Sequence, residues 1–317
     1  MQEYHKSVLT REVLNLLQPK SEGSLLIDGT MGEGGHSLIF LNAFPNLKVV
    51  GLDADSEIQA VAKVRLASFD NRLSYYNTWS DEFFQNYPQS LSRPDLILFD
   101  LGISMYHYTK SKKGFSFNAD DDLDMRLSPS LPLRAYDIVN SFSVSQMESI
   151  LKDYGEERFA HRIAVGIVKE RGVKKIESAR QLAKIIYDLV PAKFRHSPIH
   201  PATKTFQSLR IKVNKELERL PRLLQLSFGV LKVGGRLGVI TFHSLEDRIV
   251  KCYFRDLASS CTCPATFPVC KCGGKAKARL ITKKAVAPAA DEISENNAAR
   301  SAKLRVVEKL EENEALR

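Results

Sequence analysis

Long apolar runs are missing from this chain. No stretch of about 18 apolar residues occurs, so we expect no membrane-spanning helix. Residues 1–6 also lack the charged-then-apolar pattern of a secretory signal, and the two absences together predict a soluble cytoplasmic protein. Hydrophobic residues still make up 44% of the 317 positions, which is enough for a substantial core and excludes a disordered chain. This length favours two domains.

Acidic residues are outnumbered, with 37 Asp and Glu against 46 Lys and Arg, for a net charge of +9. Such an excess suits a polyanionic partner, because Lys and Arg make most protein contacts to phosphate. A basic enzyme that never touches nucleic acid would show the same balance. Charge alone therefore does not choose between these two alternatives.

Cysteine is scarce, and four of the five cysteines stand together in two C-x-C pairs. In a cytosolic protein such a cluster favours metal over disulfides, and four thiolates suffice for one structural zinc. The usual zinc spacing is C-x-x-C, so a compact loop of four reduced thiols remains an equal alternative. No neighbouring base predicts a catalytic thiol. The residues are Cys261, Cys263, Cys270 and Cys272.

The first hundred residues alternate between strand-like and helix-like segments. This alternation predicts βαβ units and a parallel sheet covered on both faces, the beginning of a doubly wound α/β fold. The strand-like apolar runs are residues 25–27, 48–52, 73–76 and 96–99.

The pattern changes after residue 105. A polar stretch is followed by segments of helical periodicity, and a long helix is predicted to begin just after Pro201. Residues 236–242 then form another buried strand, and two later segments are candidate edge strands. We therefore predict a sheet domain from residues 1–105 and 206–317, with an inserted helical domain at 106–205.

A glycine-rich turn follows the first strand, which ends at Asp28. Gly32, Gly34 and Gly35 would let a ligand approach the backbone closely. The spacing is not the G-x-G-x-x-G of dinucleotide sites, and an acid beside a pyrophosphate would be unfavourable. It suits a cationic ligand better, such as the ammonium and sulfonium of S-adenosylmethionine.

Two further acids end predicted strands. Asp53 is placed to accept hydrogen bonds from the ribose hydroxyls of an adenosine, and Asp100 ends the fourth strand. Ligands of open α/β sheets bind at the carboxyl ends of the strands, where these acids would meet Asp28. Trp79, the only tryptophan, follows the third strand and is predicted to stack on adenine, although tryptophans are more often core residues. The sequence thus predicts an S-adenosylmethionine site.

A set of longer motifs makes the resemblance specific. Together they resemble the RsmH (MraW) family of 16S ribosomal RNA cytosine-N4 methyltransferases, over residues 5 to about 307. The resemblance implies a class I (Rossmann-like) methyltransferase sheet with an inserted helical substrate-recognition domain. It also implies a P-site cytidine of the small ribosomal subunit as target. The motifs are 28–36 (DGTMGEGGH), 100–104 (DLGIS), 113–117 (KGFSF), 123–126 (LDMR), 154–160 (YGEERFA), 200–207 (HPATKTFQ) and 242–248 (FHSLEDR).

The family's contacts to the methyl donor carry over by position. Two departures stand out: His107 occupies a place where the family commonly has Gln, and residues 121–122 are Asp-Asp instead of Gly-Pro. Imidazole still offers one donor or acceptor, so donor binding is compatible with the change. The implied contacts are Gly34, Gly35, His36, Asp53, Trp79, Asp100 and His107.

A polar stripe on the helix after Pro201 is the main candidate for RNA recognition. Its residues lie at i, i+4, i+7 and i+11, and this mixture favours an internal network or an RNA contact over a solvated face, which usually bears Lys and Glu. The loop at 115–117 and the Arg of LDMR complete the candidate substrate surface. The residues are Thr203, Gln207, Arg210 and Asn214, with Phe115, Phe117 and Arg126.

Methyl transfer to an amine is helped by a group that accepts a hydrogen bond from the amine N–H. Asp100 is our candidate for contacting the cytosine N4, with His243 as a second polar group at the same sheet edge. Alternatively, Asp100 binds only the methyl donor. A competing function is an RNA-binding ribosome-assembly factor that uses S-adenosylmethionine only as a ligand. The sequence leaves open whether the chain forms a homodimer.

Overall fold

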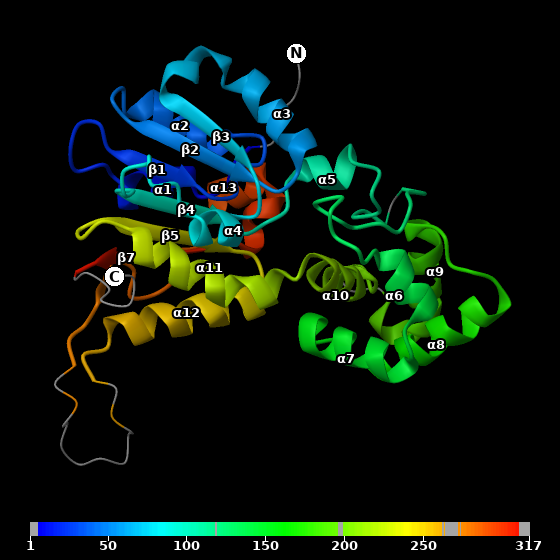
Figure 1. Ribbon diagram of the computed structural model, residues 1–317. Coiled ribbons are helices and arrows are strands. Elements are labelled where there is room, and N and C mark those ends of the chain that lie inside the picture. Colours follow the sequence, from blue (N-terminus) through cyan, green and yellow to red (C-terminus); the bar gives the residue numbers. More distant parts are fainter. Residues whose placement is uncertain are drawn as a thin grey trace. The chain divides into compact units, whose positions relative to one another are not determined.

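The computed structural model describes residues 6–117, 119–195, 199–261, 263, 272 and 274–310. The chain divides into two compact units, Met1–Ile103 with Glu218–Arg317, and Ser104–Leu217 (Figure 1). We call them the sheet unit and the helical unit. Within the described ranges, no helix has the length and apolar character needed to cross a membrane.

The sheet unit is built on a seven-stranded sheet, counted over the described residues, with the order β3-β2-β1-β4-β5-β7-β6. Strands β1 to β5 run parallel, and β7 is antiparallel to both of its neighbours, β5 and β6. The expected class I (Rossmann-like) α/β sheet is confirmed. The strands are β1 (Leu25–Asp28), β2 (Lys48–Asp53), β3 (Leu73–Asn77), β4 (Leu96–Asp100), β5 (Arg236–Thr241), β6 (Ala278–Leu280) and β7 (Lys303–Lys309).

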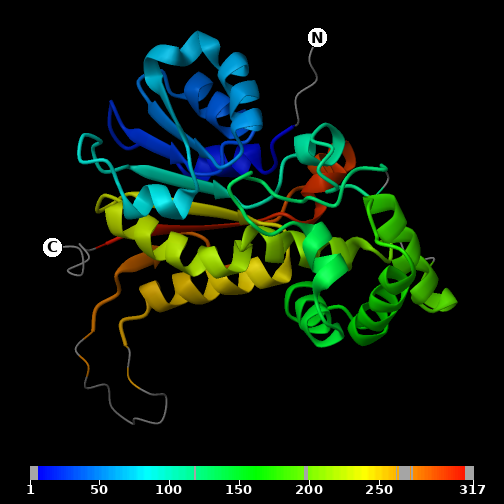
Figure 2. The same ribbon diagram turned by 45° about the vertical axis from the view of Figure 1, so that its right-hand side comes forward.

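Helices cover both faces of this sheet, which is why its central strands are apolar along their whole length. Successive residues point to opposite faces, so Leu26 packs with the core on one side and Ile27 with the core on the other. In Figure 2, α11 and α12 lie along one face. The helices are α1 (Thr10–Leu16), α2 (Gly35–Ala43), α3 (Ser56–Arg65), α4 (Ser80–Gln85), α11 (Glu216–Val230), α12 (Ser244–Ala258) and α13 (Ala290–Glu295), with short 3-10 turns at Ala67–Arg72 and Asn297–Ser301.

The helical unit contains α-helices and one 3-10 turn among its regular elements of three residues or more, within the described part of the chain. Ser178 caps α9 by accepting a hydrogen bond from Gln181 N–H, as its position predicts, and Ser143 caps α7 in the same way. Buried residues such as Met147, Ile163 and Leu182 form the interior. The helices are α5 (Met105–Thr109), α6 (Ala135–Ser141), α7 (Val144–Gly155), α8 (Ala160–Val173), α9 (Ala179–Leu189) and α10 (Thr203–Asn214), with the turn at Ala192–Phe194.

The border between the units differs from the sequence-based one at α10. The sequence assigned residues 206–217 to the sheet domain, whereas their contacts place them in the helical unit. Helix α10 packs closely on α7, because Gly155 has no side chain: a Cβ there would lie 2.3 Å from Ser208 Oγ. The predicted long helix is also two helices, since Lys215 adopts a left-handed conformation (φ 54°) between α10 and α11.

Candidate functional site

The predicted acids come together at one edge of the parallel sheet. In the strand register, Asp28 lies level with Gly51 on β2 and with Leu98 on β4. Asp53 and Asp100 therefore stand two positions farther along the strands on either side of Asp28. His243 follows the end of β5, the next strand of the sheet, at the same edge. The carboxyl ends of these four neighbouring strands form the candidate site.

Asp28 is the most deeply buried of these acids. Its side chain is 1% exposed and accepts a hydrogen bond from Ser37 Oγ at 2.7 Å, in the first turn of α2. Burial raises the pKa of Asp28, although His36 and Ser37 oppose this shift. Asp28 thus ties the end of β1 to the start of α2.

The glycine turn between β1 and α2 adopts conformations that favour glycine. Gly32 and Gly34 have φ of 54° and 76°. Gly35 leaves no room for a side chain, because a Cβ there would lie 2.0 Å from Ser7 Oγ. Gly32 N–H donates to Asp53 Oδ2 at 2.8 Å, which links the turn to the end of β2. The turn therefore presents main chain at the sheet edge, as the sequence predicts.

Trp79 stands directly before α4 and is half-buried. The guanidinium of Arg219 lies 4.5 Å from the centre of its ring and also pairs with Asp81 at 2.6 Å. This arrangement covers one face of the indole with a cation and fixes the ring's orientation. No sequence pattern pointed to Arg219, which lies 140 residues away from Trp79 along the chain.

Asp100 has the least satisfied carboxylate of the site. Its main-chain N–H donates to Thr30 Oγ1 at 2.6 Å, but its Oδ1 is buried and has no hydrogen-bond partner among the described residues. Burial raises the pKa of Asp100 to about 6; His36 and Gly102 N–H lower it, while Asp28 and Glu246 raise it. Buried acceptors normally have donors, so this oxygen indicates a place for a ligand's N–H or cationic group.

His36 lies beside Asp100, with Nδ1 3.6 Å from Asp100 Oδ2. Its other nitrogen, Nε2, is 2.9 Å from the carbonyl of Val8 and must donate to it. In the neutral ring Nδ1 then carries a lone pair toward Asp100. His36 opposes the effect of burial on its neighbour, since the imidazole lowers the pKa of Asp100.

His243 is used as the N-cap of α12. Its Nδ1 accepts a hydrogen bond from Glu246 N–H at 3.4 Å, and Glu246 Oε2 accepts from Phe242 and His243 N–H at 2.9 and 3.3 Å. These bonds form a capping box with His243 as the N-cap and Glu246 as its partner. This reciprocal capping holds the imidazole at the sheet edge.

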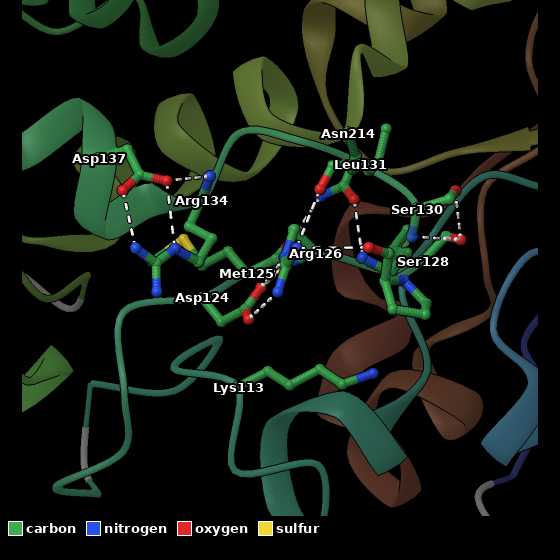
Figure 3. Close-up of polar contacts among 12 residues, drawn as sticks. Lys113, Asp124, Met125, Arg126, Ser128, Ser130, Leu131, Arg134, Asp137 and Asn214 are labelled. Atoms are coloured by element: carbon green, nitrogen blue, oxygen red, sulfur yellow. Dashed lines mark hydrogen bonds and ion pairs between the residues drawn. The ribbon is translucent and has the colours of Figure 1, made fainter.

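In the helical unit, the KGFSF and LDMR motifs lie against each other (Figure 3). Gly114 has φ 75°, and a Cβ there would lie 2.2 Å from the carbonyl oxygen of Asp122. Met125 N–H donates to the carbonyl of Lys113 at 2.7 Å. We call residues 113–131 the motif loop.

Arg126 works inside this loop. Its guanidinium donates to both carboxylate oxygens of Asp124 at 2.7 and 2.8 Å and to the carbonyl of Leu131 at 2.9 Å (Figure 3). Burial opposes ionisation of Asp124, but the hydrogen bonds from Arg126 outweigh it and lower the pKa of Asp124. Arg126 therefore acts as a clamp on the loop.

The polar stripe of α10 is engaged within the helical unit as well. Asn214 is fully buried; its amide donates to the carbonyls of Met125 and Arg210 and accepts from Leu127 N–H, each bond 2.8–2.9 Å. These bonds attach the motif loop to α10. The other contacts are Arg210 to Glu216 at 2.8 and 2.9 Å and Gln207 to the carbonyl of Tyr154 at 3.4 Å, while Thr203 is half-buried in the first turn.

Aromatic side chains complete the description of this unit. Phe115 is 4% exposed, with its ring centroid 5.3 Å from that of His107, which is buried too. Phe117 stacks on His200 at 4.5 Å and 21°, and Tyr187 lies 6.0 Å from the same imidazole. His200 belongs to the motif at 200–207, but the sequence analysis assigned it no role. Burial lowers the pKa of His200.

The structure gathers three of the four clustered cysteines. The thiol sulfurs of Cys261, Cys263 and Cys272 all lie within 4.8 Å of one another. Cys270, the fourth predicted metal ligand, is outside the described residues.

Comparison with known proteins gives the family. The model of the MraW methylase family matches residues 2–310. The chain is 54% identical over 315 residues to a ribosomal RNA small subunit methyltransferase H of Treponema denticola, covering 99% of this chain and all of that one. Proteins of the same name from Treponema pallidum and Borrelia turicatae are 42% and 44% identical, covering 96% and 98% of this chain and 92% and 99% of their own. The chain belongs to the MraW methylase family.

Proposed function

We propose that this protein transfers a methyl group from S-adenosylmethionine to the exocyclic N4 of a cytidine in the P-site region of 16S ribosomal RNA, in the cytoplasm. The names of its relatives support the small-subunit RNA as substrate, and the motif resemblance supports the cytosine nitrogen. The observation that carries the chemistry is the buried Oδ1 of Asp100 at the carboxyl edge of the sheet, which no described residue engages in a hydrogen bond.

The residues at this edge fit S-adenosylmethionine. Asp53 would accept hydrogen bonds from the ribose hydroxyls, Trp79 would stack on the adenine, and the turn from Gly32 to His36 would face the methionine end. The acids fit a cationic ligand better than a pyrophosphate, and Asp100 has an acceptor to offer. When bound, S-adenosylmethionine supplies an electrophilic methyl group on a sulfonium.

Asp100 is the proposed catalytic residue. The lone pair of cytosine N4 is delocalised into the ring, which makes the amine a poor nucleophile. A carboxylate that accepts a hydrogen bond from N4–H localises this lone pair and stabilises the positive charge that develops as the N–C bond forms. With a pKa of about 6, Asp100 is ionised at neutral pH and is able to take the proton that the nitrogen then loses. His243, held by Glu246, would orient the base.

The helical unit is proposed to recognise the RNA by means of the shape of its motif loop. Arg126, Arg210 and Asn214 are engaged in internal bonds, so we assign them the fixing of this loop and of α10. Phe115, within the loop, and His107 are buried. Phe117, Gln207 and Thr203 are half-exposed and remain candidates for direct contact with RNA. The target cytosine has to leave its stack to be methylated, which suits a single-stranded or strained RNA site.

The test is transfer of labelled methyl from S-adenosylmethionine to purified small subunits that lack the modification. Mass spectrometry then locates the label, which we expect on cytosine N4 in the P-site region. Donor binding without label on subunits or naked RNA would contradict the proposed activity and favour an assembly factor. The proposed chemistry requires neither zinc nor a homodimer.

A further inference from the structure

Three cysteines of the described segments between α12 and β6 lie together. Cys261 and Cys263 lie on the limb that leaves α12, and Cys272 lies on the limb that leads to β6. The sulfurs of Cys261 and Cys272 are 3.9 Å apart, and all three thiols lie within 4.8 Å of one another. In Figure 1 the described ends of this loop, in yellow and orange, extend away from α12.

These distances match those between ligands of a tetrahedral metal. With Zn–S bonds of about 2.3 Å, tetrahedral geometry places the sulfurs about 3.8 Å apart. A disulfide would require about 2.05 Å. Small movements of the three side chains would therefore complete one face of a zinc tetrahedron.

The main chain around the thiols is arranged independently of any metal. Ser259 Oγ donates to the carbonyl of Cys261 at 2.8 Å and accepts from its N–H at 3.2 Å. Lys277 N–H donates to the carbonyl of Leu257 at 2.8 Å, which closes the base of the loop. Gly274 lies beside Cys272; a Cβ there would be 3.4 Å from its sulfur. Both limbs are thus held with their cysteines on the same side.

The composition of the loop selects the type of metal. Residues 257–290 contain no Asp or Glu, so this segment offers no carboxylate ligand for Ca²⁺ or Mg²⁺. Thiolates favour Zn²⁺ instead, and Lys275 and Lys277 are exposed cations on the limb that leads to β6. Cys261 and Cys272 are exposed, so these thiols are not held together by a buried apolar core.

We propose that Cys261, Cys263 and Cys272 bind one structural Zn²⁺ that links the limb leaving α12 to the limb leading to β6. The metal would replace the missing hydrophobic core of a short segment, as it does in small zinc modules. The fourth coordination position is completed by a ligand other than these three. This site is separate from the proposed methyl transfer.

The test measures metal per chain in the full-length protein purified without chelator. We expect about one zinc per chain in the wild type. Zinc affinity should fall by more than about 100-fold in each of the variants Cys261→Ser, Cys263→Ser and Cys272→Ser. Substitutions of residues that only support the metal ligands already lower metal affinity by about 10- to 100-fold. Cys252→Ser is the matched control, since Cys252 lies on α12 outside the cluster, and it should retain the metal.

A second measurement follows the loop itself. Removing zinc should accelerate proteolytic cleavage within 259–277 while leaving S-adenosylmethionine affinity unchanged. A wild type without zinc, retention of zinc by all three serine variants, or an iron chromophore would each overturn the proposal. So would a disulfide between Cys261 and Cys272, revealed by the loss of two titratable thiols in denaturant.

Discussion

The two units use the polar residues of their motifs in opposite ways. In the sheet unit, Asp100 keeps a buried oxygen at the end of its strand that has no hydrogen-bond partner in the described part of the chain. In the helical unit, the guanidinium of Arg126 and the amide of Asn214 bond to neighbouring side chains and carbonyls. A motif residue with an unmet hydrogen bond indicates a ligand, whereas a motif residue that is fully engaged indicates a shape that has to be held.

The cause is the backbone on which each motif lies. Strands satisfy their own main chain, so a side chain at a carboxyl end, such as Asp100, can keep an atom available for a ligand. The motif loop has little regular structure and includes Met125 at φ 59°, and Lys112, directly before the loop, has φ 53°; such conformations cost about 1 kcal/mol or more for residues other than glycine. Side-chain bonds have to hold such a loop in place.

The largest effect is expected from Asp100→Asn, which keeps the shape of the side chain and removes its charge. The rate of RNA methylation should fall by about 10²- to 10³-fold, as on loss of one electrostatic contact to a transition state. Single-turnover methylation and donor binding, measured separately, distinguish the two roles of Asp100. If donor affinity fell as far as the rate, Asp100 would serve only the methyl donor.

The raised pKa of Asp100 predicts two dependences on pH. Activity should fall as the pH drops through about 6, because the carboxylate becomes protonated. The folded state binds this proton more tightly than the unfolded state, whose carboxyl has the ordinary pKa of 3.8. Ionisation therefore reduces stability as the pH rises from 3.8 to about 6, and the reduction persists above 6. Asp100→Asn should melt higher than wild type at pH 7, with the difference vanishing near pH 3; an equal Tm at both would contradict this.

Asp53→Ala and Arg210→Ala should separate the units. Asp53→Ala should weaken S-adenosylmethionine binding by about 10- to 100-fold, since hydrogen bonds to a charged group contribute about 1.5–3 kcal/mol. Arg210→Ala should leave this affinity unchanged and impair RNA methylation, because it breaks the ion pair between Arg210 of α10 and Glu216, which lies within the helical unit. Calorimetric titration with the donor checks both variants. Equal losses of donor affinity would contradict the assignment of donor binding to the sheet unit and of RNA recognition to the helical unit.

Asn214→Ala tests whether the shape of the motif loop matters for RNA. The change leaves buried main-chain groups unpaired and should cost about 2 kcal/mol in the free energy of unfolding. Asn140 is a matched control, because its amide also makes three bonds, to Tyr136 and Ile176, none of which is to the motif loop. In denaturant titrations both variants should lose similar stability, but only Asn214→Ala should lose RNA methylation at temperatures where both are folded. Equal RNA methylation by the two variants would show that the shape of the motif loop does not matter for RNA recognition.

The smallest effect is expected from Arg219→Ala. Losing the cation over Trp79 should weaken donor binding by about threefold, as for an exposed cation–π contact of roughly 0.5–1 kcal/mol. Arg222→Ala is the control, since Arg222 shares the contact with Asp81 at 3.8 Å, whereas Arg219 also lies over the indole. Donor titration followed by Trp79 fluorescence measures both variants. An identical loss of donor affinity in both variants would show that the effect arises from the contact with Asp81 and not from the cation over Trp79.

Sequence reasoning succeeded best where one local pattern decides the geometry. Strands that end in Asp28, Asp53 and Asp100 have to meet at one edge once they are parallel, and the glycines mark the turn between β1 and α2. It failed at the break between α10 and α11, because Lys215 carries none of the usual signals for a left-handed residue. It likewise missed Arg219, whose contact with Trp79 joins distant segments.

By itself, the sequence determined the sheet, the identity of the acids at its edge and the family motifs, because all of these follow from short-range periodicity and spacing. Only the tertiary structure decided which polar atoms are satisfied. The bonds from Asn214 to the motif loop span 87 and 89 residues, and the approach of Cys272 to Cys261 depends on how the loop closes. Pairing over such separations is set by packing, which no local pattern encodes.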